Sequence, residues 1–172
     1  MIDLNNMNEV IVVNENDEVI GKMPKKEAHK NGVLHRIAVV YVENSKGEIL
    51  VQNRADGYLD HSSAGHVDPG ESYLEAAKRE LNEELGIKDV KLNRIGHAST
   101  IGEKYKNGIA SHTFDIFACV GEPGELQADE VKSVYWADPQ KVLGEMQKDK
   151  SKFCGGFIES LKIYLGARDI TK

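Results

Sequence analysis

Carboxylates are concentrated in one short segment near the middle of the chain. Residues 79–84 read Arg-Glu-Leu-Asn-Glu-Glu, so Glu83 and Glu84 follow Glu80 by three and four positions. Residues at these spacings are neighbours on an α-helix, where like charges destabilise the helix by about 0.2–0.5 kcal/mol per pair. Arg79 relieves part of this repulsion by reaching Glu83 at i+4. The rest is best offset by a hard divalent cation, which prefers several carboxylate oxygens as ligands.

The flanking sequence predicts the helix that positions these carboxylates. Ser72 and Glu75 form an S-x-x-E capping box, so the helix is expected to begin at Ser72. Gly86 can adopt a positive φ and end it. Apolar residues at spacings of three and four predict the buried stripe, which consists of Leu74, Ala77, Leu81 and Leu85.

The loop before this helix contains two glycines, Gly65 and Gly70. Because glycine has no Cβ, the backbone can approach the carboxylates closely, and a carbonyl oxygen can join the coordination of an ion. The alternative for the acidic segment taken alone is a solvated helix face without chemistry.

The whole stretch 65–87 resembles the Nudix box. Its pattern is Gly, five residues, Glu, seven residues, Arg-Glu, an aliphatic residue, any residue, Glu-Glu, any residue, Gly and an aliphatic residue. Every position of this pattern is matched here. The resemblance implies a Nudix fold, an α/β/α sandwich with a mixed β-sheet. It also implies a hydrolase that cleaves the diphosphate linkage of a nucleoside diphosphate derivative with Mg²⁺ or Mn²⁺.

The family also implies roles for residues in the box. Carried over position by position, Glu80, Glu83 and Glu84 hold the ions, with the Gly65 carbonyl as an extra ligand. Arg79 orients the glutamates through ion pairs, and Glu71 anchors the loop.

The identity of the general base stays open at this stage. Family members use either a helix glutamate or an acid on a later loop. Here the helix candidates are Glu83 and Glu80, and the later candidate is Glu130, which is otherwise a solvated loop acid. Arg54, at the end of a strand entering the expected cleft, is a weak candidate for a phosphate contact and is as readily a surface residue.

Composition narrows the possible partners and surroundings. The 172 residues suit one domain, with 40% hydrophobic and 29% charged residues. The net charge of −6 argues against a nucleic-acid polymer or an anionic membrane as partner. The sequence shows neither a membrane span nor a signal peptide. Cys119 and Cys154 are expected to be reduced and buried, which favours the cytoplasm.

Read in order, the chain predicts a mixed α/β domain over residues 1–172. The expected parts are a hairpin at 9–24, a short helix at 24–31, strands at 35–43 and 48–54, a loop at 55–61, the box at 65–87, strands at 90–100, 111–120 and 131–136 with a polar loop at 101–108, and C-terminal helices within 138–166 that start at Asp138 and Phe153.

Outside the box, the chain is similar to a branch of the superfamily that contains isopentenyl-diphosphate isomerase and related hydrolases. The matching features are the segment 14–21, Ala28-His29, Leu34-His35 and Ala64-Gly65-His66. In the isomerase, three histidines and two glutamates bind a metal, and a cysteine just before the box transfers a proton. Here the cysteine position is Ala64, and the two glutamates fall near Ala110 and His112. Losing the thiol and both carboxylates removes the acid and base that allylic isomerisation needs, so the resemblance favours the hydrolases.

Four histidines raise a further hypothesis. His29, His35 and His66 stand at places similar to the isomerase's metal-binding histidines, although the first pair is one residue closer together, and His112 is the fourth. They either converge on a second metal site, since neutral imidazole suits Zn²⁺ or Mn²⁺, or are remnants with structural hydrogen bonds.

Three functions therefore compete. The leading one is a divalent-metal-dependent pyrophosphohydrolase of a small diphosphate substrate, and a homodimer is possible because Nudix proteins are often dimers. The second is isopentenyl-diphosphate isomerase-like activity. The third is a non-catalytic nucleotide-sensing module, which the intact glutamates disfavour.

Overall fold

The computed structural model of the chain describes residues 8–105 and 108–170. In order, its elements are β1 (Glu9–Val13), β2 (Val19–Pro24), α1 (Lys25–Asn31), β3 (His35–Glu43), β4 (Ile49–Arg54), β5 (Leu59–Asp60), β6 (Ser63–His66), α2 (Tyr73–Leu85), β7 (Asn93–Tyr105), β8 (Gly108–Val120), β9 (Val131–Ala137), α3 (Pro139–Lys148), the 3₁₀ helix η2 (Lys150–Lys152) and α4 (Phe157–Ile170).

Strand β3 lies at the centre of the sheet. It pairs with β8 in parallel and with β1, β4 and β6 antiparallel, while β9 joins on β4 and β7 on β8. Its run of apolar residues buries side chains on both faces of the sheet, as expected for a central strand. Val40 and Val42 face one core, and Val39 and Tyr41 face the other.

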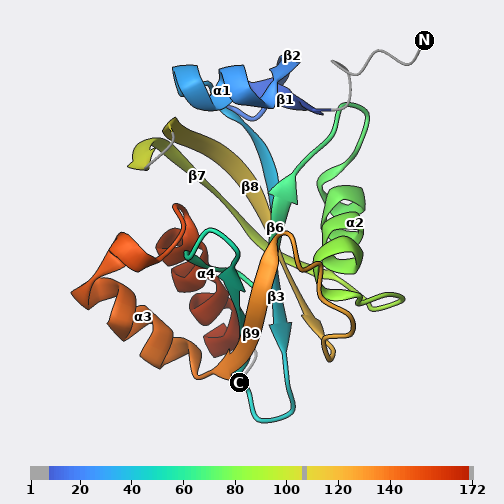
Figure 1. Cartoon of the computed structure of the whole chain (residues 1–172), viewed down its shortest axis with the longest axis vertical. Helices are drawn as coiled ribbons and strands as arrows, with labels where there is room; N and C mark the ends of the chain where they lie inside the picture. Colours follow the sequence, from blue (N-terminus) through green and yellow to red (C-terminus); the bar gives the residue numbers. More distant parts are fainter. Residues whose placement is uncertain (1–7, 106–107, 171–172) are drawn as a thin grey trace.

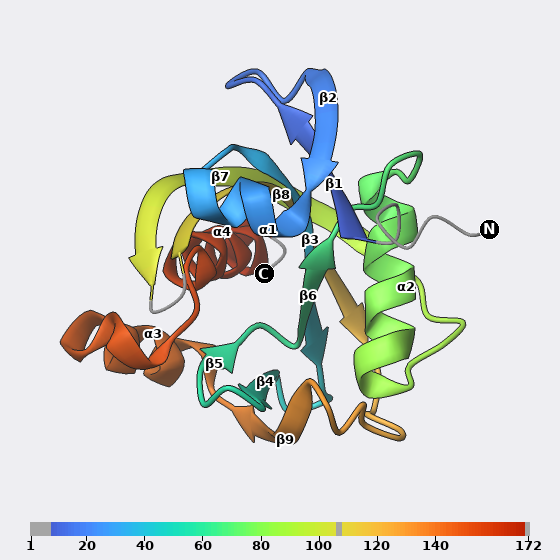
Figure 2. The same cartoon turned by 45° about the horizontal axis from the view of Figure 1, so that its top comes forward.

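Helices cover both faces of the sheet. Figure 1 shows α2 on one side and α3 with α4 on the other, and Figure 2 shows α1 and the β1–β2 hairpin at one end of the sheet. The first core packs α2 onto the sheet, and the second packs α3 and α4 onto it. The predicted α/β architecture with a mixed sheet between helices is therefore confirmed.

Helix α2 has the caps that its sequence predicts. The Ser72 hydroxyl accepts from the backbone N–H of Glu75, and the Glu75 carboxylate accepts from the N–H of Ser72. Gly86 ends the helix with a φ of 64°. The predicted stripe was wrong in one place, because Leu74 is 39% exposed. At the start of the helix, Tyr73, Ala76 and Ala77 pack in or against the core instead.

Two segments expected to be loops contain strands. β5 lies within residues 55–61, and β6 begins just after it and pairs with β3, with Gly65 opposite Ala38. β7 continues through the predicted loop at 101–108 as far as Tyr105, where it pairs with Gly108. Polar residues suit β7 because it lies at the edge of the sheet and most of its side chains are exposed or half-buried.

The last helix starts four residues later than the sequence predicts. Phe153 instead forms a bridge with Leu59, and the N–H of Cys154 donates to the Leu59 carbonyl at 2.8 Å. Gly156, with a φ of 77°, then turns the chain into α4. Both cysteines are free, but only Cys119 is buried, whereas Cys154 is half-buried. None of the helices in the described ranges is long and apolar enough to cross a membrane.

Truncating the buried face of α2 tests how the helix is held. Leu81 is 1% exposed in the core between α2 and the sheet. Leu81→Ala is expected to lower the free energy of unfolding by about 2–5 kcal/mol, because it removes buried methyl groups and leaves a cavity. Leu74→Ala on the same helix is the matched control and should cost less than about 1 kcal/mol. Urea denaturation of both variants measures this, and equal losses would contradict the packing described.

Candidate active site

Arg79 connects the loop that precedes α2 to the carboxylates on the helix. Its guanidinium donates to both carboxylate oxygens of Glu71 at 2.7 and 2.9 Å and to the His66 carbonyl at 2.9 Å. It also donates to Glu80 at 2.7 Å and to Glu83 at 3.3 Å. Hydrogen bonding to Glu71 raises the pKa of Arg79 and lowers that of Glu71, so both groups are charged. The planar guanidinium thereby fixes three carboxylates relative to one backbone carbonyl.

The three glutamates of the box lie in different environments. The Glu83 side chain is 55% exposed, that of Glu80 is 14% exposed, and Glu84 as a residue is only 3% exposed. The acidic segment is therefore not a uniformly solvated helix face, because Glu84 is buried. Glu84 accepts a short hydrogen bond from the Gln52 side chain, and no described Lys, Arg or His forms an ion pair with it.

Burial shifts the titration of two of these acids. It raises the pKa of Glu80, with the charges of Glu83 and Glu130 adding to the effect and Arg79 opposing it. Burial also raises the pKa of Glu84, helped by Glu80, Asp60 and Glu130. An acid that is buried and surrounded by other acids is stabilised in its charged form by a nearby cation.

Gly65 leaves room for a carboxylate beside the backbone. A Cβ at this position would lie 2.1 Å from the Glu80 carboxyl carbon, so the Glu80 side chain could not stay where it is. Glycine therefore lets Glu80 approach the backbone of β6 closely. The structure brings together Gly65, Arg79, Glu80 and Glu83 at the junction of β6 and α2, with Glu84 on the buried side of the same helix.

Glu130 lies in a loop that packs against the end of α2. The Gln127 N–H donates to the Glu84 carbonyl at 3.0 Å, and the Gly124 N–H donates to the Leu85 carbonyl at 2.8 Å. Glu130 follows in the turn before β9, where its side chain is exposed. Its charge contributes to the raised pKa values of Glu80 and Glu84, so it lies on the same side of the molecule as the box.

Arg54 is engaged by other residues of the chain. It forms ion pairs with Asp56 at 2.8 Å and with the buried Asp60 at 3.1 Å. Asp60 also accepts from the backbone and ring nitrogens of His61, and the other ring nitrogen of His61 lies 2.6 Å from the Ser160 hydroxyl. This Asp-His-Ser chain is buried throughout, so it is a structural network inaccessible to a substrate.

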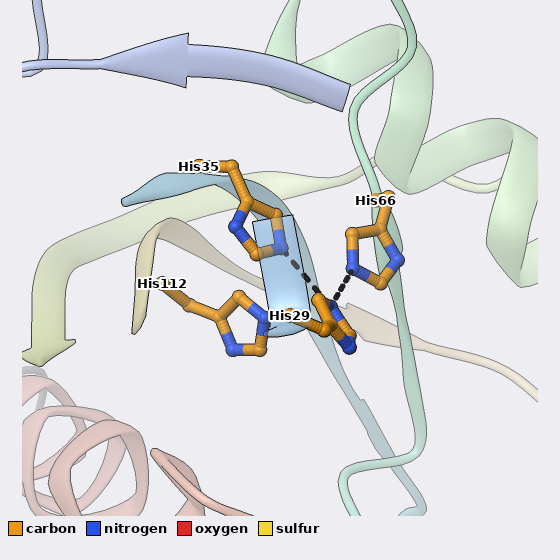
Figure 3. A group of neighbouring side chains, drawn as sticks. All are labelled: His29, His35, His66 and His112. Atoms are coloured by element: carbon orange, nitrogen blue, oxygen red, sulfur yellow. Dashed lines mark hydrogen bonds between the residues drawn. The ribbon is translucent and has the colours of Figure 1, made fainter. Parts of the chain in front are cut away.

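The four histidines do converge. They come from α1, β3, β6 and β8, and each offers one ring nitrogen within 4.8 Å of the others (Figure 3). Burial, followed by the charges of neighbouring groups, lowers the pKa of His29 to about 4. Burial likewise lowers the pKa of the other three, so all four rings are neutral at pH 7.

Two polar residues of the site were not predicted. Gln52 bonds Glu84, and its signal in the sequence is a polar residue in the apolar strand Ile49–Arg54. Tyr105, whose hydroxyl lies 2.6 Å from Nδ1 of His29, falls in the stretch expected to be a loop. The sequence holds no local signal for this contact, which depends on how β7 runs past α1.

The donor atoms of the box suit a hard divalent cation. Three carboxylates and a nearby backbone carbonyl provide oxygen ligands, which Mg²⁺ and Mn²⁺ prefer. A cation there would offset the cost of burying Glu84 and Glu80. The residues present therefore fit such an ion.

Comparisons with known proteins identify a family for this chain and similar folds. The model of the NUDIX domain family matches residues 33–159. An isopentenyl-diphosphate Delta-isomerase from Pectobacterium atrosepticum is 31% identical over 159 residues, which is 88% of each protein. An uncharacterized Nudix hydrolase from Pseudomonas aeruginosa is 32% identical over 161 residues, covering 90% of this chain and 92% of that protein. A crystal structure of a Deinococcus radiodurans protein has a TM-score of 0.73 at 22% identity, covers 90% of this chain and 97% of that one, and supports the fold.

The buried Asp60 network predicts a pH-dependent contribution to stability. Burial alone would raise the pKa of Asp60, but hydrogen bonds from His61 and the charge of Arg54 outweigh it and lower the pKa to about 2. Since this lies below the unfolded value of about 3.9, the carboxylate stabilises the fold above pH 4, and this stability is lost as the pH falls toward 2. Asp60→Asn is expected to lower the free energy of unfolding at pH 7 by roughly 2 kcal/mol.

Denaturant titrations should show that the difference in unfolding free energy between Asp60→Asn and wild type shrinks as the pH is lowered from 4 to 2. Asp56→Asn, which removes the exposed partner of Arg54, is the control and should change stability by less than about 1 kcal/mol. A deficit that does not vary with pH would contradict the role given to the Asp60 charge.

Proposed function

The chain belongs to the Nudix family, and on that premise we propose that it is a Mg²⁺- or Mn²⁺-dependent hydrolase of the diphosphate linkage in a nucleoside diphosphate derivative or other small nucleotide. The resemblance to the superfamily and to its isomerase-like branch is confirmed by the family match and the similar proteins. The observation that carries the proposal is the intact set of glutamates around Arg79, with Glu84 buried and unpaired by any described cationic side chain.

Glu80, Glu83, Glu84 and the Gly65 carbonyl would hold the ion. When bound, it neutralises phosphate oxygens and makes a bound water more acidic. Arg79 keeps Glu80 and Glu83 oriented, and Glu71 keeps Arg79 in place through two hydrogen bonds. A cation held by these oxygens would lower the repulsion that a chain of net charge −6 presents to an anionic substrate.

The general base would be one of two acids. Glu83 is the most exposed of the three helix glutamates and is accessible to water. Glu130 is also exposed, and its charge acts on Glu80 and Glu84. A helix acid and a loop acid are therefore both candidates for the group that takes a proton from the attacking water. Replacing each in turn separates them, because loss of the true base removes the rise of turnover with pH that reports its deprotonation, whereas loss of the other acid leaves that rise in place.

The substrate is proposed to be a small anion, with no role for a nucleic-acid polymer or a membrane. Arg54 is supported less well as a phosphate ligand, since Asp56 and Asp60 already bind it. The cytoplasmic location and the possible homodimer expected from the sequence remain predictions.

Isomerisation of isopentenyl diphosphate is the second candidate, because a relative of that name is 31% identical over 88% of this chain. The residues at the relevant places argue against it. Ala64 provides no thiol, and Ala110 and His112 provide no carboxylate where the resemblance places two. Without an acid and a base on opposite faces of the substrate, the double bond cannot be moved.

A hydrolysis screen with Mg²⁺ tests the proposal. The panel contains nucleoside di- and triphosphates, nucleotide sugars, dinucleotide cofactors, dinucleoside polyphosphates and isoprenoid diphosphates. Glu83→Gln is expected to lower the turnover of any substrate found by roughly 10²–10⁴-fold, because it removes a metal ligand or base while the core is untouched. Release of phosphate products is the measurement, and circular dichroism checks the fold.

Glu145→Gln is the matched control, because this glutamate is exposed on α3 away from the box. It should retain wild-type turnover. Wild-type turnover in Glu83→Gln would refute the metal assignment. If no substrate in the panel is hydrolysed, the non-catalytic nucleotide-sensing module is favoured. Conversion of isopentenyl diphosphate into its double-bond isomer would favour the isomerase.

A further inference from the structure

The histidine cluster, defined as His29, His35, His66 and His112, is formed by elements that are far apart in the sequence. His35 on β3 lies beside His112 on β8, and His66 on β6 lies opposite Ile37, two residues along β3. Gly32, with a φ of 63°, ends α1 and turns the chain back so that His29 reaches the same place. Figure 3 shows the four rings around a common centre.

The hydrogen bonds at the edge of the cluster orient two of its rings. Nδ1 of His35 lies 2.7 Å from the Val33 carbonyl, which can only accept, so Nδ1 carries the proton. The neutral ring then presents a lone pair on Nε2 to the centre. Nδ1 of His29 is held by the Tyr105 hydroxyl at 2.6 Å. Such outer partners are what metal-bound histidines usually have.

The centre of the cluster has nitrogens that hydrogen bonds alone leave unsatisfied. Nε2 of His29 lies 3.2 Å from Nε2 of His35 and 3.1 Å from Nε2 of His66. A single N–H can point to only one of these two atoms. Nε2 of His112 is buried and has no hydrogen-bond partner in the structure. A buried polar atom without a partner costs about 1–3 kcal/mol, so nitrogens gathered in this way are better suited to donating lone pairs to one cation than to bonding one another.

We propose that the histidine cluster binds one transition-metal ion of the Zn²⁺ class through four imidazole nitrogens. Neutral imidazole suits such ions, whereas Mg²⁺ prefers oxygen ligands. Bonds of about 2.0–2.1 Å to four nitrogens in a tetrahedron place the nitrogens about 3.3–3.4 Å apart. Two separations in the structure, 3.1 and 3.2 Å, are close to this, and all four nitrogens lie within 4.8 Å of one another.

Four protein ligands leave no open position, which is the pattern of a structural site. This donor set differs from that of the isomerase in having no carboxylate, so the site has a different preference for metals and offers no acid. The ion would attach α1, a helix of seven residues, to three strands of the sheet. A helix so short is unstable without tertiary contacts. The site is independent of the hydrolysis proposed above.

The test is a titration of the chelator-treated, full-length protein with Co²⁺, with excess Mg²⁺ present to occupy the helix glutamates. We expect one equivalent of Co²⁺ to give the intense visible absorption of four-coordinate cobalt, which Zn²⁺ abolishes. Zn²⁺ should also raise the melting temperature, because an ion that binds only the folded state stabilises it. Tyr105→Phe should weaken binding by roughly 10–100-fold, the usual effect of losing an outer partner.

His112→Asn should weaken binding more than Tyr105→Phe does. His97→Asn is the matched control, since His97 bonds Asp115 and Thr113 outside the cluster, and it should leave the affinity unchanged. If His112→Asn fails to fold, the partly exposed His29 takes its place as His29→Asn. A weak, six-coordinate cobalt spectrum, no binding to the folded wild type, or equal affinity in wild type and variant would overturn the proposal.

Discussion

The site depends on the hydrogen bonds of one guanidinium. Arg79 donates hydrogen bonds to Glu71 and the His66 carbonyl, which precede the helix. It also donates to Glu80 and Glu83 on the helix. A lysine could occupy the same space but could not form this planar fork of bonds. Because β6 is paired to the central strand and α2 is packed onto the sheet, the arginine joins two elements that are each already fixed. The carboxylates are thereby arranged before any ion or substrate arrives.

Buried charge distinguishes this segment from an ordinary acidic helix face. The Glu84 side chain is buried on α2 and accepts a hydrogen bond from Gln52 of β4. The absence of a side chain at Gly65 lets Glu80 lie against the backbone there. Both features cost stability unless a cation balances them. His66, the residue after Gly65, belongs to the histidine cluster, and its carbonyl accepts from Arg79. The two candidate metal sites therefore share one strand, β6, at the same end of the sheet.

The sequence predicted those parts of the fold whose signals are local. The capping box at Ser72, the stop at Gly86 and the apolar run of β3 all describe interactions among neighbouring residues, and the structure has them. The exposure of Leu74 and the burial of Glu84 depend on where α2 meets the sheet, which no pattern within the helix encodes. The late start of α4 has the same cause, because a bridge to distant β5 competes for Phe153. The convergence of the histidines was a hypothesis from resemblance, and only the tertiary structure shows their rings together.

The role of Arg79 in arranging the carboxylates is tested most directly by measuring Mn²⁺ binding with electron paramagnetic resonance, in the protein with Arg79 and in Arg79→Lys. Both proteins carry His112→Asn, or His29→Asn if the former does not fold, to weaken binding at the histidine cluster. If Arg79 arranges the carboxylates, the dissociation constant should rise by roughly 10–100-fold in Arg79→Lys, while circular dichroism shows an unchanged fold. Equal affinity in the two proteins would mean that the glutamates bind the ion without the arginine, and would contradict the account.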